Sequence, residues 1–138
     1  MAVATENNRF FRAVTLWSVV LAVMGLIYYF SSLPAKRIPC LFPHSDIVFH
    51  LAIFGLLAFC FSRAMEGTFR GMNISRLVLY SVIFCTAYGI SDEYHQLFVG
   101  DRCCSGLDIF VDSAGAFAGS MIFCFKARLP LVKILFAK

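Results

Sequence analysis

The chain has 138 residues, of which 60% are hydrophobic and only 14% are charged. A soluble domain usually contains about 45–50% apolar and about 25% charged residues, and a small protein needs a polar coat over a large surface. The composition therefore argues against a soluble monomer, a disordered chain and a secreted disulfide scaffold. It predicts an integral membrane protein that forms a single domain over residues 1–138.

Four apolar segments are the candidate membrane spans, at about residues 13–30, 47–63, 77–98 and 107–126. The first contains 18 uncharged residues, which cover about 27 Å as a helix, close to the thickness of a bilayer core. Backbone in lipid must satisfy its own hydrogen bonds, and no alternating ten-residue strands are present, so we expect an all-α four-helix bundle. A cleaved signal peptide is the alternative for the first segment; its length and the far-end Tyr28 and Tyr29 favour a retained helix.

The distribution of charge predicts the orientation of the bundle. Nine Lys and Arg residues lie in the N-terminal segment, the second connection and the C-terminal tail, against three in the first and third connections. Six of the eight acids lie on the side with three bases. The positive-inside rule then places both termini in the cytoplasm. The basic balance is a topology signal, and no motif for reading nucleic acid is present.

Polar and ionisable residues gather where the last three spans meet the predicted outer face, and such residues near a membrane span indicate function by default. They are Asp46, His50, Asp92, Glu93, His95, Gln96, Arg102, Asp108 and Asp112. Spacings of three and four residues place Asp92, His95 and Gln96 on one helix face, with Glu93 pointing elsewhere.

Three interpretations of these polar residues stay open. The acids could flank helix ends for structural reasons, since negative charge suits a helix N-terminus. They could form a binding or catalytic pocket in which a carboxylate and a histidine exchange protons and Arg102 holds a phosphate. A divalent cation bound by His50, His95 and two carboxylates is the third interpretation, although no tight metal-binding spacing is present.

These residues resemble the signature of the VanZ-like family of small bacterial membrane proteins. The similar stretches are Phe30-Ser-Ser-Leu-Pro34, Asp46-Ile-Val-Phe-His50, Ser91-Asp-Glu-Tyr-His-Gln96, Arg102 and Asp108-x-x-x-Asp112-x-x-Gly115-x-x-x-Gly119. The family has a Lys where this chain has Ile47, and a Pro-Gly turn where this chain has Gly100-Asp101. The resemblance implies an inner-membrane protein of about four spans, and the founding member of the family is associated with resistance to the glycopeptide teicoplanin.

Small residues and cysteines add two further expectations. Gly115 and Gly119 form a G-x-x-x-G motif that packs helices closely, either within this chain or across a homo-oligomer. Cys40 could form a disulfide with Cys103 or Cys104 if the outer loops lie in an oxidising space.

Two hypotheses of different class follow. In the first, the pocket engages a lipid-linked envelope precursor or its phosphate head group. Asp92 or Glu93 acts with His95 as the acid–base or binding pair. The other contacts come from Asp46, His50, Gln96 and Arg102, and Asp108 and Asp112 could bind a bridging cation. In the second, the protein is a non-enzymatic subunit that docks a partner through its outer acids. An ion pathway fits less well, because the central parts of the spans are nearly all apolar.

Overall fold

The fold is a bundle of four long helices, seen in a computed structural model that describes residues 2–37, 43–69 and 71–128. The helices are α1 (Ala2–Ser31), α2 (Ser45–Thr68), α3 (Ile74–Gln96) and α4 (Gly106–Arg128), with a short 3₁₀ turn η1 (Ala35–Arg37) after α1. No strand occurs in the described ranges, and all four helices are long and apolar enough to cross a membrane. The all-α prediction with four membrane-length helices is confirmed.

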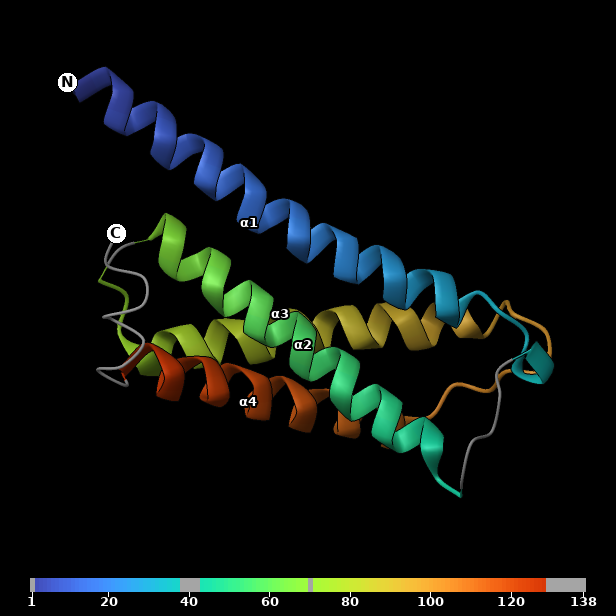
Figure 1. Ribbon diagram of the computed structural model, residues 1–138. Helices are drawn as coiled ribbons and strands as arrows, with labels where there is room; N and C mark the ends of the chain where they lie inside the picture. The colour runs from blue at the N-terminus through green and yellow to red at the C-terminus, as the bar shows by residue number, and fades with distance from the viewer. Residues whose placement is uncertain (1, 38–42, 70, 129–138) are drawn as a thin grey trace.

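The helices alternate in direction along the bundle (Figure 1). The start of α1, the α2–α3 connection and the end of α4 lie at one end, and η1 and the α3–α4 connection lie at the other. Helix α2 packs most extensively on α4, α3 packs mainly on α4, and α1 packs mainly on α2. Up-and-down topology with short connections is typical of four-helix bundles. The residues expected to form the polar site therefore come to a single end of the molecule.

Helix α1 begins well before the apolar run that predicted it. It starts at Ala2, eleven residues ahead of the expected start at residue 13, and a membrane-length segment runs from Asn7 to Ser31. Exposed Arg9 and Phe10 lie within the helix, ahead of the uncharged run. The helix can continue past the lipid because its backbone bonds are internal whether the side chains face lipid or water.

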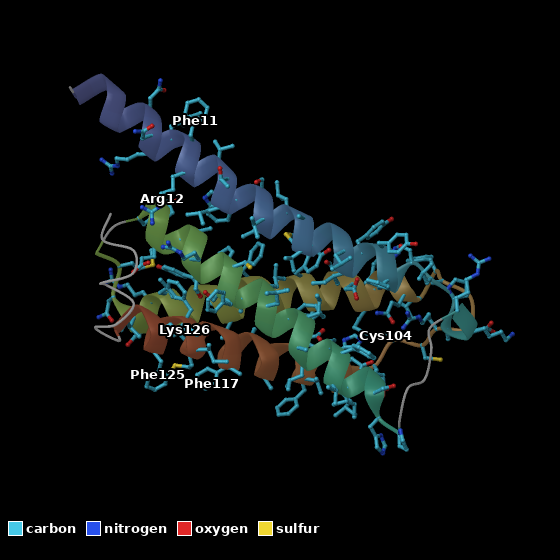
Figure 2. All side chains as sticks on the ribbon, viewed as in Figure 1. Phe11, Arg12, Cys104, Phe117, Phe125 and Lys126 are labelled. Carbon is cyan, nitrogen blue, oxygen red and sulfur yellow. The ribbon has the colours of Figure 1, made fainter. Side chains whose placement is uncertain are left out.

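The interior of the bundle is small and the lipid-facing surface is large. Phe54, Leu57 and Ala58 of α2 are fully buried and pack with apolar residues of the other three helices. Many large apolar side chains instead point outward, among them Phe117 and Phe125 of α4 (Figure 2). An exposed apolar surface of this extent would be a liability in water. It is what a helix bundle surrounded by lipid requires, and the protein is a multi-pass membrane protein.

The closest helix contact joins α2 and α4 through glycines. Gly115 lies against the carbonyl group of Leu51, and Gly119 lies against that of Gly55. A Cβ atom on Gly115 or Gly119 would overlap these backbone atoms. The G-x-x-x-G motif thus packs within the chain, as small residues in membrane helices commonly do. A homo-oligomer through the same motif stays a prediction, and α2 already covers these two glycines.

The cysteines differ in how deeply they are buried. Cys85 and Cys124 are buried and Cys60 is half-buried, whereas Cys103 and Cys104 are exposed free thiols in the α3–α4 connection. Cys40, the expected disulfide partner of Cys103 or Cys104, lies outside the described residues.

Candidate functional site

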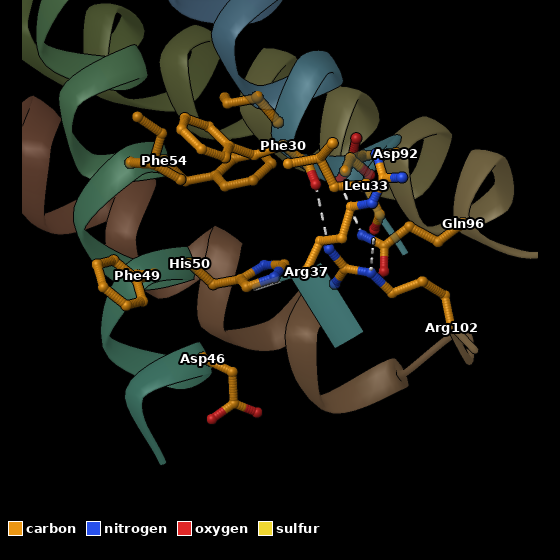
Figure 3. A pocket seen from close by; sticks show the side chains of 13 residues that line it. Phe30, Leu33, Arg37, Asp46, Phe49, His50, Phe54, Asp92, Gln96 and Arg102 are labelled. Atoms are coloured by element: carbon orange, nitrogen blue, oxygen red, sulfur yellow. Dashed lines mark hydrogen bonds between the residues drawn. The ribbon is translucent and has the colours of Figure 1, made fainter. Parts of the chain in front are cut away.

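A pocket of about 340 Å³ opens at the end of the bundle that carries η1 and the α3–α4 connection (Figure 3). Its volume falls in the range of small-molecule sites, which is about 300–1,000 Å³. Residues of α1, η1, α2, α3 and the α3–α4 connection line it. They are Ile27, Phe30, Ser31, Leu33, Arg37, Asp46, Phe49, His50, Ile53, Phe54, Asp92, Gln96 and Arg102.

The pocket has an apolar side and a polar side. Phe30, Phe49 and Phe54 belong to the apolar side, and Figure 3 shows the polar end of His50 facing Arg102 across the hollow. Phe30 and Phe49 are also about half exposed on the outside of the bundle. The apolar side is therefore continuous with the lipid-facing surface, and an occupant could have one apolar end and one polar end.

A chain of hydrogen bonds joins the end of α3 to the start of α4. The Gln96 side-chain Nε2 donates to Asp92 Oδ2 at 3.0 Å and to Glu93 Oε1 at 3.3 Å. The other Glu93 oxygen accepts from the backbone N–H of Ser105 at 2.7 Å. All three α3 side chains are buried. The expected pairing of Asp92 with Gln96 is present, but Glu93 does not point elsewhere; it joins the same group.

His50 and Asp112 form the buried contact between α2 and α4. His50 Nδ1 lies 3.0 Å from Asp112 Oδ1, and the Asp112 side chain is only 1% exposed. The second Asp112 oxygen, Oδ2, has no hydrogen-bond partner among the described residues. It fits against Gly89, where a Cβ atom would lie 2.8 Å from it. A buried carboxylate oxygen without a partner is costly and calls for an explanation.

Asp108 approaches the same histidine from the first turn of α4. His50, Glu93 and Asp108 each place one possible metal-ligand atom within 4.8 Å of the other two. Ser105 caps α4, since its hydroxyl accepts from the Asp108 backbone N–H at 3.3 Å. An acid three residues after such a cap usually accepts the N–H of the capping residue. Glu93 takes that N–H here, which leaves the Asp108 carboxylate free to face His50 and Glu93.

Arg102 lines the pocket and also binds two backbone carbonyl groups at the end of α1. Its Nε donates to the carbonyl oxygen of Leu33 at 3.2 Å, and its Nη2 donates to that of Phe30 at 3.1 Å. Carbonyl groups near a helix C-terminus lack intrahelical partners. The Phe30 carbonyl also accepts the Leu33 N–H at 3.2 Å, and Arg102 adds a second bond to it. Arg37 also lines the pocket, and its guanidinium makes no hydrogen bond or ion pair within the described ranges.

His95 and Asp46 lie apart from this group. His95 Nε2 is 3.0 Å from the Ser32 hydroxyl, and the imidazole lies against the Tyr28 ring with 4.6 Å between ring centroids. His95 therefore faces α1, and the geometry does not bring it to Asp92 or Glu93 as the acid–base interpretation expected. The exposed Asp46 lines the mouth of the pocket, away from the buried acids (Figure 3). The histidine beside the buried acids is His50.

Sequence reasoning missed three contributors to the site. Arg37 is one of the three bases in the first and third connections, and its place just after the first span is the signal that indicates a pocket residue. The Ser105-x-x-Asp108 pattern is a recognisable helix start that predicts the cap. Nothing in the sequence around Gly89 indicated that Asp112 would pack against it.

The comparisons with known proteins give one match. The chain matches the family described as VanZ/LLP1 over residues 11–127, which include most of α1, all of α2 and α3, nearly all of α4 and the whole pocket. No curated protein and no solved structure matches the chain.

Proposed function

This chain belongs to the VanZ/LLP1 family, and on that premise we propose that it binds an anionic, lipid-linked molecule of the cell envelope in the pocket between its helices. One observation supports the proposal above the others. The pocket has an apolar side open to lipid and a polar side that carries two guanidinium groups, those of Arg37 and Arg102. His50 and the acids Asp46 and Asp92 also line it. Guanidinium groups are the preferred partners of phosphate oxygens. A lipid phosphate would place its chain along the apolar side and its head group at the polar side.

The proposed setting is the bacterial inner membrane with the pocket on the outer face. The nine-to-three distribution of basic residues supports this orientation, since bases favour the cytoplasmic side. An outward pocket at the membrane boundary would meet lipid-linked cell-wall intermediates where they are used. This location would also connect the protein to the response to teicoplanin-type antibiotics, the phenotype that the family resemblance implies.

The binding test compares farnesyl phosphate with farnesol on the purified full-length chain in nanodiscs. Each compound is titrated and counted as a bound adduct by native mass spectrometry. We expect the phosphate to bind at least about tenfold more tightly than the alcohol, the equivalent of one charge-assisted contact. Arg37→Gln should remove most of this preference. This variant should not disturb the fold, because the Arg37 guanidinium makes no hydrogen bond or ion pair within the described residues.

The matched control is Arg76→Gln, which removes an exposed arginine from the start of α3 at the opposite end of the bundle. It should leave the preference for phosphate unchanged. Equal affinity for phosphate and alcohol, or an unchanged preference in Arg37→Gln, would contradict the proposal. Teicoplanin susceptibility of a host that expresses wild type or Arg37→Gln at equal membrane levels then connects binding to the phenotype.

The second candidate is a non-enzymatic subunit that docks a partner through its outer acids. The contacts of Arg102 with Phe30 and Leu33 favour it, because they show a residue of the cluster in a structural role. Under this alternative, Asp92→Asn should leave the teicoplanin response intact, since the amide keeps the shape of the carboxylate. Loss of the response in Asp92→Asn at normal membrane levels would instead favour acid–base or ligand chemistry.

A further inference from the structure

Negative charge is concentrated beside the pocket without matching positive charge. The carboxylates of Glu93, Asp108 and Asp112 lie around the single imidazole of His50, and Asp92 is joined to Glu93 through Gln96. The ion pairs within the described ranges join none of these acids to a lysine or arginine. Buried charge is expensive unless it is paired or coordinates a metal. The group therefore needs a cation or bound protons.

The donor atoms have the composition and spacing of a metal site. His50, Glu93 and Asp108 offer one nitrogen and two oxygen ligands that lie within 4.8 Å of one another. Ligand atoms at about 2.1 Å from a tetrahedral ion lie about 3.4 Å from one another. The three side chains would therefore have to draw together by about an ångström to bind one ion. An imidazole with two carboxylates suits divalent ions such as Zn²⁺ and Mn²⁺.

Asp112 gives the independent observation that points to a ligand. Its carboxylate is fully buried, lies 3.0 Å from His50 Nδ1, and keeps one oxygen without a partner in the described structure. A carboxylate that accepts the Nδ1–H of a histidine fixes the tautomer and directs the Nε2 lone pair to a metal. Asp112 is in the right place to act as this positioning residue for His50.

We propose that His50, Glu93 and Asp108 bind a divalent transition-metal ion beside the pocket, with Asp112 orienting the His50 imidazole. The site joins α2, α3 and α4, so the ion would hold three helix ends together. It does not depend on the anionic ligand proposed above, because all three metal ligands are side chains of this chain. A cation at this position would also reduce the negative charge beside the pocket, which would otherwise repel the phosphate that we propose it binds.

The test measures Mn²⁺ binding to the purified full-length chain in detergent. Mn²⁺ is chosen because thiolates bind it weakly, so the exposed Cys103 and Cys104 do not compete for it, and the purification tag must lack histidine. The protein is stripped with a chelator, titrated with Mn²⁺ and followed by electron paramagnetic resonance of the free ion. We expect one Mn²⁺ per chain, with affinity lowered at least about tenfold in Asp108→Asn and in Glu93→Gln.

Asp101→Asn is the matched control, since it neutralises an exposed acid at the same end of the bundle but outside the site. It should bind Mn²⁺ as the wild type does. Thermal unfolding of the stripped proteins checks the folding of each variant, and added Mn²⁺ should raise the melting temperature of wild type but not of Asp108→Asn. Absence of stoichiometric binding to wild type, or equal binding to wild type and Asp108→Asn, would overturn the proposal and leave protonated acids as the explanation.

Discussion

Asp101 adopts a backbone conformation that most residues avoid. Its φ is +61°, in the left-handed region, directly before Arg102. Glycine pays no steric cost in this region. Aspartate tolerates the left-handed region better than most residues, but an L-residue still loses about 1 kcal/mol. The turn that carries Arg102 to the end of α1 is therefore mildly strained in this chain.

We expect Asp101→Gly to relieve this strain. The same change removes the exposed ion pair between Asp101 and Lys36, which are 3.0 Å apart, and exposed pairs contribute about 0.2–1 kcal/mol. Asp101→Asn separates the two effects, because asparagine also tolerates the left-handed region but has no charge. The free energy of unfolding in detergent should be about 1 kcal/mol higher for Asp101→Gly than for Asp101→Asn. A lower value for the glycine variant would show that the turn is unstrained.

Helical spacing predicted part of the site and could not predict the rest. Relative to Asp92, a helix places Gln96 at about +40°, Glu93 at about +100° and His95 at about −60°. The pattern correctly indicated that Asp92 and Gln96 lie together. It could not show on which side of Asp92 the bundle interior lies, because neighbouring helices decide that. The interior lies on the side of Glu93, and so His95 faces α1 instead.

At the scale of helices, the contact between α2 and α4 has no room for a side chain at Gly119. A Cβ atom there would overlap the backbone of Gly55, which cannot move away as a flexible side chain could. Gly119→Ala should therefore lower the free energy of unfolding in detergent by at least about 1–3 kcal/mol, the cost of overpacking. It should also weaken metal binding, because α2 and α4 hold His50 and Asp108.

Gly25→Ala is the matched control for this change. Gly25 also lies inside a membrane helix, α1, but a Cβ atom on it would meet nothing within 4 Å. Alanine is a better helix former than glycine by up to about 1 kcal/mol, so Gly25→Ala should be neutral or stabilising. Comparable destabilisation by Gly25→Ala and Gly119→Ala would mean that the effect is general to glycine and does not come from the α2–α4 contact.

The sequence predicted the number of helices correctly but not where each helix begins. Lipid forces every apolar segment to satisfy its own backbone, so the uncharged runs correctly predicted four helices. An uncharged run in the sequence indicates which residues contact lipid. A helix, by contrast, begins and ends at its capping residues. Asn73 shows the difference, since its side chain accepts the Ser75 N–H at 3.0 Å and begins α3 at Ile74, three residues before the predicted span.

At the scale of the whole molecule, the alternation of helix directions brings the pocket, the acids and the exposed thiols to the same end (Figure 1). The order of the spans was enough to predict that Asp46, Arg102 and Asp108 share this end. Which helices would be neighbours depends on side-chain packing, and the glycines of α4 make α2 its main neighbour. That neighbour relation places His50 beside Asp112.

The orientation of this end can be tested with the native thiol of Cys103. Cys103 is exposed in the α3–α4 connection, and exposed Ser75 lies at the opposite end, at the start of α3. We compare a variant that keeps only Cys103 with a cysteine-free variant that carries Ser75→Cys. A membrane-impermeant maleimide should label Cys103 in intact spheroplasts. It should label the Ser75→Cys variant only after the cells are opened, because the bases around that end favour the cytoplasm. Labelling in the reverse order would place the pocket inside the cell, where it could not meet a ligand on the outer face.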